Sequence, residues 1–192
     1  MKTWLRLAFI GALATSAAFA QQYKIDPTHS SVDFGVKHMG ISTVRGSFHI
    51  TDGTIHFDPA DPAKSSVTAV IDVASVDTGE AQRDAHLKSP AFFDAAKFPT
   101  ATFTSTSVKK TSAGYDVTGN LTLHGITKPV VLHLDPPSQE ILGMDKKPHR
   151  GFSASALIVR QDFGLTWNGT LSSGDAVIGN NVKLTFDIDG VR

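Results

Sequence analysis

The chain has 192 residues, with 18 basic and 18 acidic side chains and no cysteine. A formal net charge of zero without runs of Lys or Arg argues against nucleic acid or an anionic membrane surface as a partner. Without cysteine there is no disulfide, thiolate ligand or lipidated cysteine, so stability must come from a hydrophobic core. The length is sufficient for one domain with such a core.

The first 20 residues have the pattern of a cleavable secretory signal peptide. Lys2 and Arg6 begin it, an apolar run follows, and Ala18 and Ala20 are the small residues that signal peptidase requires. The apolar run is shorter than the roughly 20 residues of a membrane-spanning helix, and no second run follows. We therefore expect residues 1–20 to be a signal peptide and residues 21–192 to form one exported, soluble domain.

From Tyr23 onward, apolar residues recur at every second position, which predicts successive antiparallel strands. The predicted rows are Val32, Phe34 and Val36; Val67, Ala69, Ile71 and Val73; Leu121 and Leu123; Leu157 and Val159; and Val182, Leu184, Phe186 and Ile188. A stretch rich in Pro, Lys and Asp, residues 135–150, predicts a long loop.

Asp52 and Gly53 form a pair that favours a two-residue hairpin turn. Such a turn would place His49 opposite His56, close enough to share a metal ion. No third ligand is placed near them by the sequence, so this pair is only a weak candidate, and we otherwise expect no metal.

One short helix is predicted at residues 80–88, which are rich in helix-forming side chains and precede Pro90. About eight strands with one helix indicate an all-β fold, either a sandwich or a closed barrel. An eight-stranded barrel is wide enough either to be filled by side chains or to hold one slender ligand.

Four segments, in this order, resemble the YceI-like family of bacterial periplasmic proteins. They are Ile25 to Ser30 (IDPTHS) with Gly46, Ser47 and Phe48; Asp77, Thr78 and Gly79 with Arg83 to Leu87 (RDAHL) and Phe92, Phe93 and Asp94; Gly119 to Gly125 (GNLTLHG) with Thr127 to Val130 (TKPV); and Arg160 to Gly164 (RQDFG).

The resemblance implies that residues 21–192 form an eight-stranded antiparallel, lipocalin-like β-barrel with a short helical segment over one side. It also implies an apolar tunnel that holds a long-chain isoprenoid or other fatty lipid, such as a polyprenyl phosphate or an isoprenoid quinone. The expected role is that of a periplasmic binding protein in transport, storage or stress response.

The expected tunnel wall is apolar and largely aromatic, since Phe is the most frequent aromatic residue of the chain. The candidates are Val32, Phe34, Val36, Phe48, Ile50, Ile71, Phe92, Phe93, Phe103, Leu121 and Phe163. Each Phe has the alternative role of simply filling a packed core.

Polar residues of the same segments are the candidates for contacts with a lipid head group. They are His29, His38, Arg83, Asp84, His86, Arg160 and Asp162. A helix places Arg83 and His86 on one face, within reach of one anion. The alternatives are structural. Asp84 pairs with Lys88, and Arg160 and Asp162, which project to the same side at a strand end, form ion pairs with groups from the helical segment.

Two other classes of function stay open at this point. One is an envelope structural or interaction protein with a solidly packed barrel. The other is a hydrolase that uses Ser30, His86 and Asp84, although no nucleophile elbow, HExxH motif or nucleotide-binding motif is present. We therefore expect a binding protein without catalytic residues or cofactor, and a homodimer stays open.

Overall fold

The structure, a computed structural model, describes residues 20–192, and the predicted signal peptide falls outside this range except for Ala20. The elements in chain order are β1 (Gln21–Ile25), β2 (Ser31–His38), β3 (Ser42–Phe57), the 3-10 helix η1 (Pro62–Lys64), β4 (Ser66–Asp77), α1 (Ala81–Lys88), β5 (Thr100–Lys110), β6 (Tyr115–Leu123), β7 (Ile126–Leu134), β8 (Ile141–Leu142), β9 (Pro148–Val159), the 3-10 helix η2 (Arg160–Phe163) and β10 (Ile178–Val191). Among the described residues, no helix is long and apolar enough to cross a membrane.

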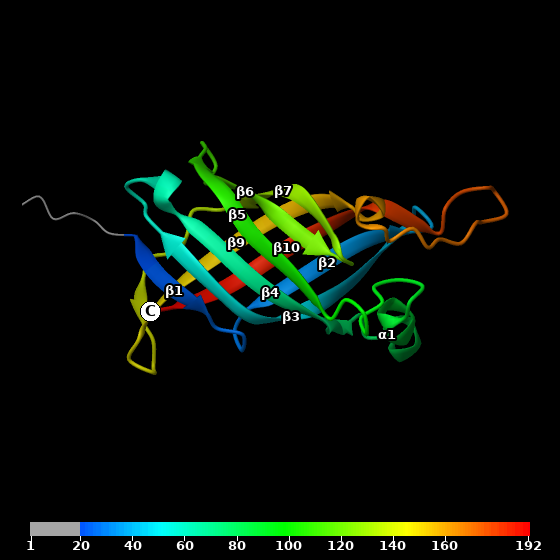
Figure 1. The fold of residues 1–192 in the computed structure, drawn as a ribbon, viewed down its shortest axis with the longest axis horizontal. Coiled ribbons are helices and arrows are strands. Elements are labelled where there is room, and N and C mark those ends of the chain that lie inside the picture. Colours follow the sequence, from blue (N-terminus) through cyan, green and yellow to red (C-terminus); the bar gives the residue numbers. More distant parts are fainter. Residues whose placement is uncertain (1–19) are drawn as a thin grey trace, which may run out of the picture.

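Eight strands form a closed antiparallel ring, which confirms the predicted barrel (Figure 1). The ring runs in the order β10, β2, β3, β4, β5, β6, β7 and β9, and β9 pairs back to β10. β1 pairs with the second half of β3 and with the end of β10, so it completes the wall beyond the first residue of β2. Closure leaves the ring without free edges.

The weakest part of the ring is the seam between β7 and β9, which are joined by only two residue pairs, His133 with Ser155 and Leu134 with Ala154. The 3-10 helix η2 lies beside this seam. Its Phe163 is 2% exposed, and the Phe163 carbonyl oxygen lies 3.2 Å from His124 Nδ1, just before β7. Phe163 therefore seals the wall where the strand pairing ends.

The predicted hairpin at Asp52 and Gly53 is wrong, because both residues lie inside β3, which runs unbroken for 16 residues. β3 pairs with β4 along this stretch, with a register shift between Ile50 and Asp52. A Cβ atom on Gly53 would lie 2.3 Å from Ile25 Cδ1, so the glycine is required for the close approach of β1. The Asp-Gly pair, which often marks a turn, here lies at a β-bulge where two strands approach closely.

The predicted row on β9 is the outward face of that strand. Leu157 is 66% exposed and Val159 is 38% exposed, whereas the alternate residues Ala156 and Ile158 are buried. Ala156 pairs with Leu184 on the neighbouring β10. Small residues on the inner face of β9 thus leave space opposite larger side chains of β10.

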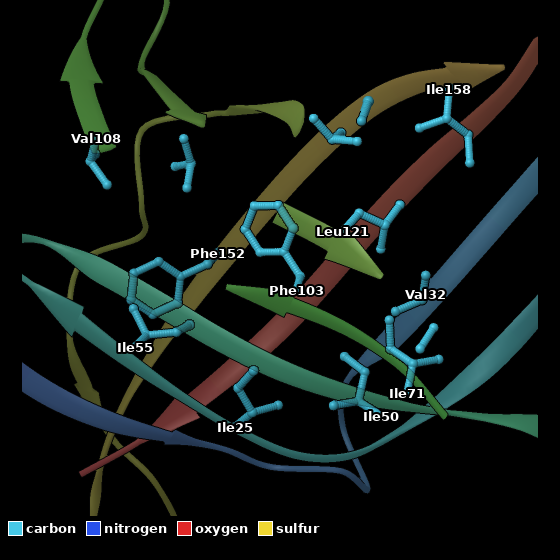
Figure 2. Packing of buried hydrophobic residues seen from close by; sticks show 14 of the residues in the cluster. Ile25, Val32, Ile50, Ile55, Ile71, Phe103, Val108, Leu121, Phe152 and Ile158 are labelled. Carbon is cyan, nitrogen blue, oxygen red and sulfur yellow. The ribbon is translucent and has the colours of Figure 1, made fainter. Parts of the chain in front are cut away.

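The inward side chains of the strands form one hydrophobic cluster along the barrel (Figure 2). Figure 2 shows Phe103 and Leu121 among the inward side chains, together with Ile25, Ile55 and Phe152. α1 begins at Ala81 with Glu80 as its N-cap, close to the predicted bounds. Residues 135–150, predicted as loop, contain the short strand β8, which pairs with the start of β9.

Candidate functional site

The barrel encloses an elongated cavity of about 550 Å³, a size typical of small-molecule sites. Its wall includes Phe57 and Phe152 at one end and His86 of α1 and Trp167 at the other. β1 and α1 lie at opposite ends of the barrel (Figure 1). Trp167 is 39% exposed, whereas Phe57 and Phe152 are 5% and 4% exposed. The cavity therefore opens beside α1, at what we call the mouth, and is closed near β1.

Aromatic rings surround the mouth. His86 of α1 lies edge-to-face against Trp167, with ring centroids 4.7 Å apart, and Phe92 lies 5.7 Å from both rings. The series continues inward through Phe93 to Phe48 at 5.5 Å. These rings join α1, the segment after it, the loop at residues 164–177 and β3 into one apolar collar.

The second half of the collar depends on a glycine. Phe34 and Phe48 lie 5.4 Å apart on neighbouring strands. A Cβ atom at Gly46, which pairs with Phe34, would lie 2.6 Å from that phenyl ring. Only glycine lets the ring lie across β3, so Gly46 shapes the wall of the cavity.

α1 is fixed at the mouth by Thr78, the residue that follows β4. Asp84 accepts hydrogen bonds from the Thr78 amide at 2.9 Å and hydroxyl at 2.5 Å. Arg83 donates from Nε to the Thr78 hydroxyl at 2.7 Å and from Nη2 to its carbonyl at 2.9 Å. The Thr78 hydroxyl thus accepts from Arg83 and donates to Asp84, and Thr78 anchors the helix through both residues.

The polar part of the wall has one sign of charge. Its ionisable residues are Lys37, His38, His56, Arg83, His86 and Arg160, and no Asp or Glu lines the cavity within residues 20–192. Because the rest of the wall is almost entirely apolar, a guest needs a long hydrocarbon part and a polar end that accepts hydrogen bonds.

Arg160 is 2% exposed, and its guanidinium is bound by carbonyl groups rather than by a carboxylate. It donates from Nη1 to Trp167 O at 2.9 Å and to Leu165 O, and from Nε to Gly179 O at 3.1 Å. Burial lowers the pKa of Arg160 below its ordinary value. Its bonds tie the loop that carries Trp167 to the start of β10, so Arg160 holds one side of the mouth in place.

Most of the predicted tunnel residues lie on the cavity wall. Those on the wall are Val32, Phe34, Val36, Phe48, Ile50, Ile71, Phe92, Phe93, Phe103 and Leu121. Phe163 does not line the cavity, because it is packed at the seam between β7 and β9. Whether these side chains contact a ligand stays a prediction.

The predicted head-group residues divide into two groups. His38, Arg83, His86 and Arg160 lie on the cavity wall. His29, Asp84 and Asp162 do not. His29 is bonded to Asp26 in the turn before β2, and Asp84 is occupied by Thr78 instead of pairing with Lys88. Asp162 is exposed on η2 and Arg160 is bonded to main-chain carbonyl groups, so the predicted ion pairs of these two residues with the helical segment are wrong.

The structure does not bring together the weak metal candidates. His49 and His56 lie on the same strand, with His49 paired to Asp72 and His56 paired to Ser66 and Gln22. The hypothetical hydrolytic set is also dispersed. The Ser30 hydroxyl accepts a hydrogen bond from the Asp189 amide on β10, whereas His86 belongs to α1. The turn between β1 and β2 and the helix α1 lie at opposite ends of the barrel (Figure 1).

A second aromatic cluster closes the opposite end of the barrel. Tyr23, which is 0% exposed, lies edge-to-face against Phe152, and Phe152 against Phe57. The Arg150 guanidinium lies 5.7 Å from the Tyr23 ring centroid and 5.4 Å from that of Phe57. Burial, then the hydrogen bond to Glu140, raises the pKa of Tyr23 to about 12.

Sequence reasoning missed Trp167 and Lys37 among the residues of the wall. Trp167 lies in the loop at residues 164–177, where no strand or helix period exists to show which way a side chain points. The usable signal was its position, because it is the one aromatic residue of this loop and closely follows a segment of the family motif.

Comparison with known proteins gives a single family. The YceI-like domain matches residues 23–190. A UPF0312 protein of Yersinia enterocolitica is 42% identical, with 100% of this chain and 97% of the relative covered. A UPF0312 protein of Pectobacterium atrosepticum is 40% identical, with the same coverage of 100% and 97%.

Solved structures have the same fold. BcnA of Burkholderia cenocepacia superposes with a TM-score of 0.73 at 26% identity, over 86% of this chain and 98% of BcnA. A Campylobacter jejuni YceI protein gives a TM-score of 0.65 at 33% identity, over 81% and 89% of the two chains. A polyisoprenoid binding domain from Saccharophagus degradans gives 0.60 at 19% identity, over 90% and 98%, which shows a shared fold.

Proposed function

Since the chain belongs to the YceI-like family, we propose that it binds one long-chain, isoprenoid-type lipid in the barrel cavity, in the periplasm, for transport or storage. The observation that carries the proposal is the cavity itself. It is elongated, apolar along its length, open beside α1 and closed near β1. This shape favours a guest that is a chain rather than a compact molecule.

Apolar contact is sufficient to hold such a guest. Burial of hydrocarbon contributes about 2.5 kcal/mol for each 100 Å² removed from water, before the costs of association are subtracted. The wall is composed mainly of branched aliphatic and aromatic side chains, with Ala154 on β9 leaving room for the chain.

The basic side chains of the mouth favour a lipid whose head group is an anion or a strong hydrogen-bond acceptor. Arg83 uses Nε and Nη2 to bind Thr78, so its Nη1 is the nitrogen available to a head group. His38 and His86 lie on the same wall, without a carboxylate beside them there. A polyprenyl phosphate satisfies these groups better than a quinone does, because phosphate carries the complementary charge.

The proposed location rests on the predicted signal peptide at residues 1–20. In an aqueous compartment between two membranes, a long-chain lipid must be shielded from water while it moves. A closed barrel with a single mouth provides that shielding. The two rival functions are less well supported, since the barrel is hollow and Ser30 lies away from His86.

The proposal is tested by following Trp167, the only Trp between residues 20 and 192, while a C55 polyprenyl phosphate is added in detergent below its micellar concentration. We expect a saturable change of Trp167 emission with a stoichiometry of about one, because the ring lies at the mouth. A straight-chain fatty acid serves as the comparison and should bind more weakly. No saturable change, or equal affinity for both lipids, contradicts the isoprenoid proposal.

A further inference from the structure

A cluster of histidine and aspartate side chains lies at the end of the barrel away from α1 and takes no part in the cavity. Asp26 and His29 lie in the turn between β1 and β2, and Asp189 lies near the end of β10 (Figure 1). Each offers one ligand atom, and these three atoms lie within 4.8 Å of one another. None of the three residues lines the cavity.

Main-chain hydrogen bonds hold the three residues together. The Asp26 amide donates to Asp189 O at 2.8 Å, and the Asp189 amide donates to the Ser30 hydroxyl at 3.0 Å. Asp26 Oδ1 accepts from the Thr28 amide at 2.8 Å, which fixes the turn. These bonds fix the main chain that carries Asp26 and Asp189 and the orientation of the Asp26 carboxylate, and His29 is positioned by its contact with that carboxylate.

The side chains are arranged as metal ligands are. His29 Nδ1 lies 2.7 Å from Asp26 Oδ2, so a shared proton occupies the place where a cation would bind. Both carboxylate oxygens of Asp189 lie 2.9 Å from His149 Nδ1, and His149 Nε2 lies 3.1 Å from Asp145 Oδ1. His149 thus orients Asp189 as an outer-shell partner orients a ligand.

We propose that Asp26, His29 and Asp189 bind a divalent transition-metal cation of the zinc type, with water as the fourth ligand. One imidazole with two carboxylates is a ligand set that Zn²⁺ accepts, whereas Mg²⁺ and Ca²⁺ prefer oxygen alone. Ligands at about 2.0–2.2 Å from tetrahedral zinc lie roughly 3.5 Å apart, so side-chain rotation is enough to close the site. The His29 side chain is 69% exposed, which gives the cation access.

The proposed site lies where three strands meet at the closed end of the barrel. It joins the turn that follows the first strand to the last strand, and His149 extends the connection to β9. Bound zinc would fasten the closed end of the barrel, because a cation that binds only the folded state stabilises that state.

The test is isothermal titration of the untagged protein with zinc chloride. We expect one site per chain, with the affinity reduced at least about tenfold in His29→Ala and in Asp189→Asn. Asp189→Asn keeps the size of the side chain and the main-chain bonds to Asp26 and Ser30. Two different variants separate the loss of a ligand from a local rearrangement, and circular dichroism checks that both are folded.

A matched control is His133→Ala. His133 Nδ1 lies 2.8 Å from Asp116 Oδ1 on the outside of the barrel, with a similarly exposed imidazole at 68%, but no third ligand lies beside this pair in the described part of the chain. Its zinc affinity should match that of the wild type, and zinc should raise the midpoint of thermal unfolding only where His29 is present. Equal affinity in His29→Ala and the wild type, or an equal loss in His133→Ala, would overturn the proposal.

Discussion

Arg160 determines whether the loop at residues 164–177 stays in place at the mouth. Its guanidinium donates hydrogen bonds to the carbonyl group of Trp167 inside that loop and to the carbonyl group of Gly179 in β10. Part of this role was predictable, since Arg160 was identified from a family segment as a residue of the site. Its partners were not, because which carbonyl groups converge on a side chain depends on the path of a loop that has no periodic pattern.

We expect Arg160→Lys to lower the free energy of unfolding by about 3 kcal/mol. The single ammonium group of lysine cannot bond at once to the carbonyl groups of Leu165, Trp167 and Gly179, which the planar guanidinium group reaches together. Urea denaturation measures the change. Arg45→Lys, at an exposed position on β3, is the matched control and should leave stability almost unchanged. Equal stability of Arg160→Lys and the wild type would show that these carbonyls do not depend on Arg160.

Tyr23 makes stability depend on alkaline pH. Its pKa is raised from 10.0 to about 12 by burial and by the hydrogen bond to Glu140. The folded state thus holds the proton more tightly than the unfolded state, so the contribution is complete below pH 10 and is lost as the pH rises through about 12. Tyr23→Phe removes this contribution.

The measurement is the difference in unfolding free energy between the wild type and Tyr23→Phe, below pH 10 and again near pH 12. We expect the wild type to be more stable at the lower pH and the difference to shrink at the higher pH. The other groups that titrate at alkaline pH are the same in both proteins, so their contributions cancel in the difference of the unfolding free energies. A difference that stays constant over this range would mean that Tyr23 does not titrate as described.

At the scale of single elements, α1 is the helical part of the mouth and packs against β4. It has no buried residue of its own, and its attachment depends on Thr78 through Arg83 and Asp84. We expect Thr78→Val, which keeps the shape and removes the hydroxyl, to accelerate amide hydrogen exchange in α1 by about tenfold.

The control is Thr122→Val on β6. The Thr122 hydroxyl also has a hydrogen-bonded partner, Thr127 at 2.8 Å, but this pair lies on the exposed surface of the barrel. Exchange in α1 should not change in Thr122→Val. If Thr78→Val leaves exchange in α1 unchanged as well, the helix is held by its apolar contacts with the collar and not by Thr78.

The elements also show what periodicity can and cannot predict. The alternating rows predicted most strands, because period two follows from the pleat itself. They failed where two faces of one strand are both apolar, as on β9, where Leu157 points outward and Ile158 inward. They failed again at Asp52 and Gly53, because a glycine needed for a close strand crossing has the same local signal as a turn.

At the scale of the whole molecule, the closed ring was predicted from the family resemblance, and periodicity alone left a sandwich open. The resemblance also predicted a hollow interior, which periodicity alone left open, since the space inside depends on how inward side chains of eight strands add up across the barrel. Ala154 illustrates the outcome, because this small residue of β9, paired with Phe186 of β10, lies on the cavity wall and leaves space there.

The central claim is that this space holds a lipid, and native mass spectrometry of the purified protein tests it most directly. The wild type should carry one long-chain isoprenoid-type lipid per chain, released on activation and identified by its mass. Ala154→Phe, which fills the cavity from β9, should lose the lipid and stay folded, whereas Thr185→Phe on the outer face of β10 should keep it. A wild-type protein that carries no lipid, or an Ala154→Phe variant that carries as much as the wild type, would contradict the account.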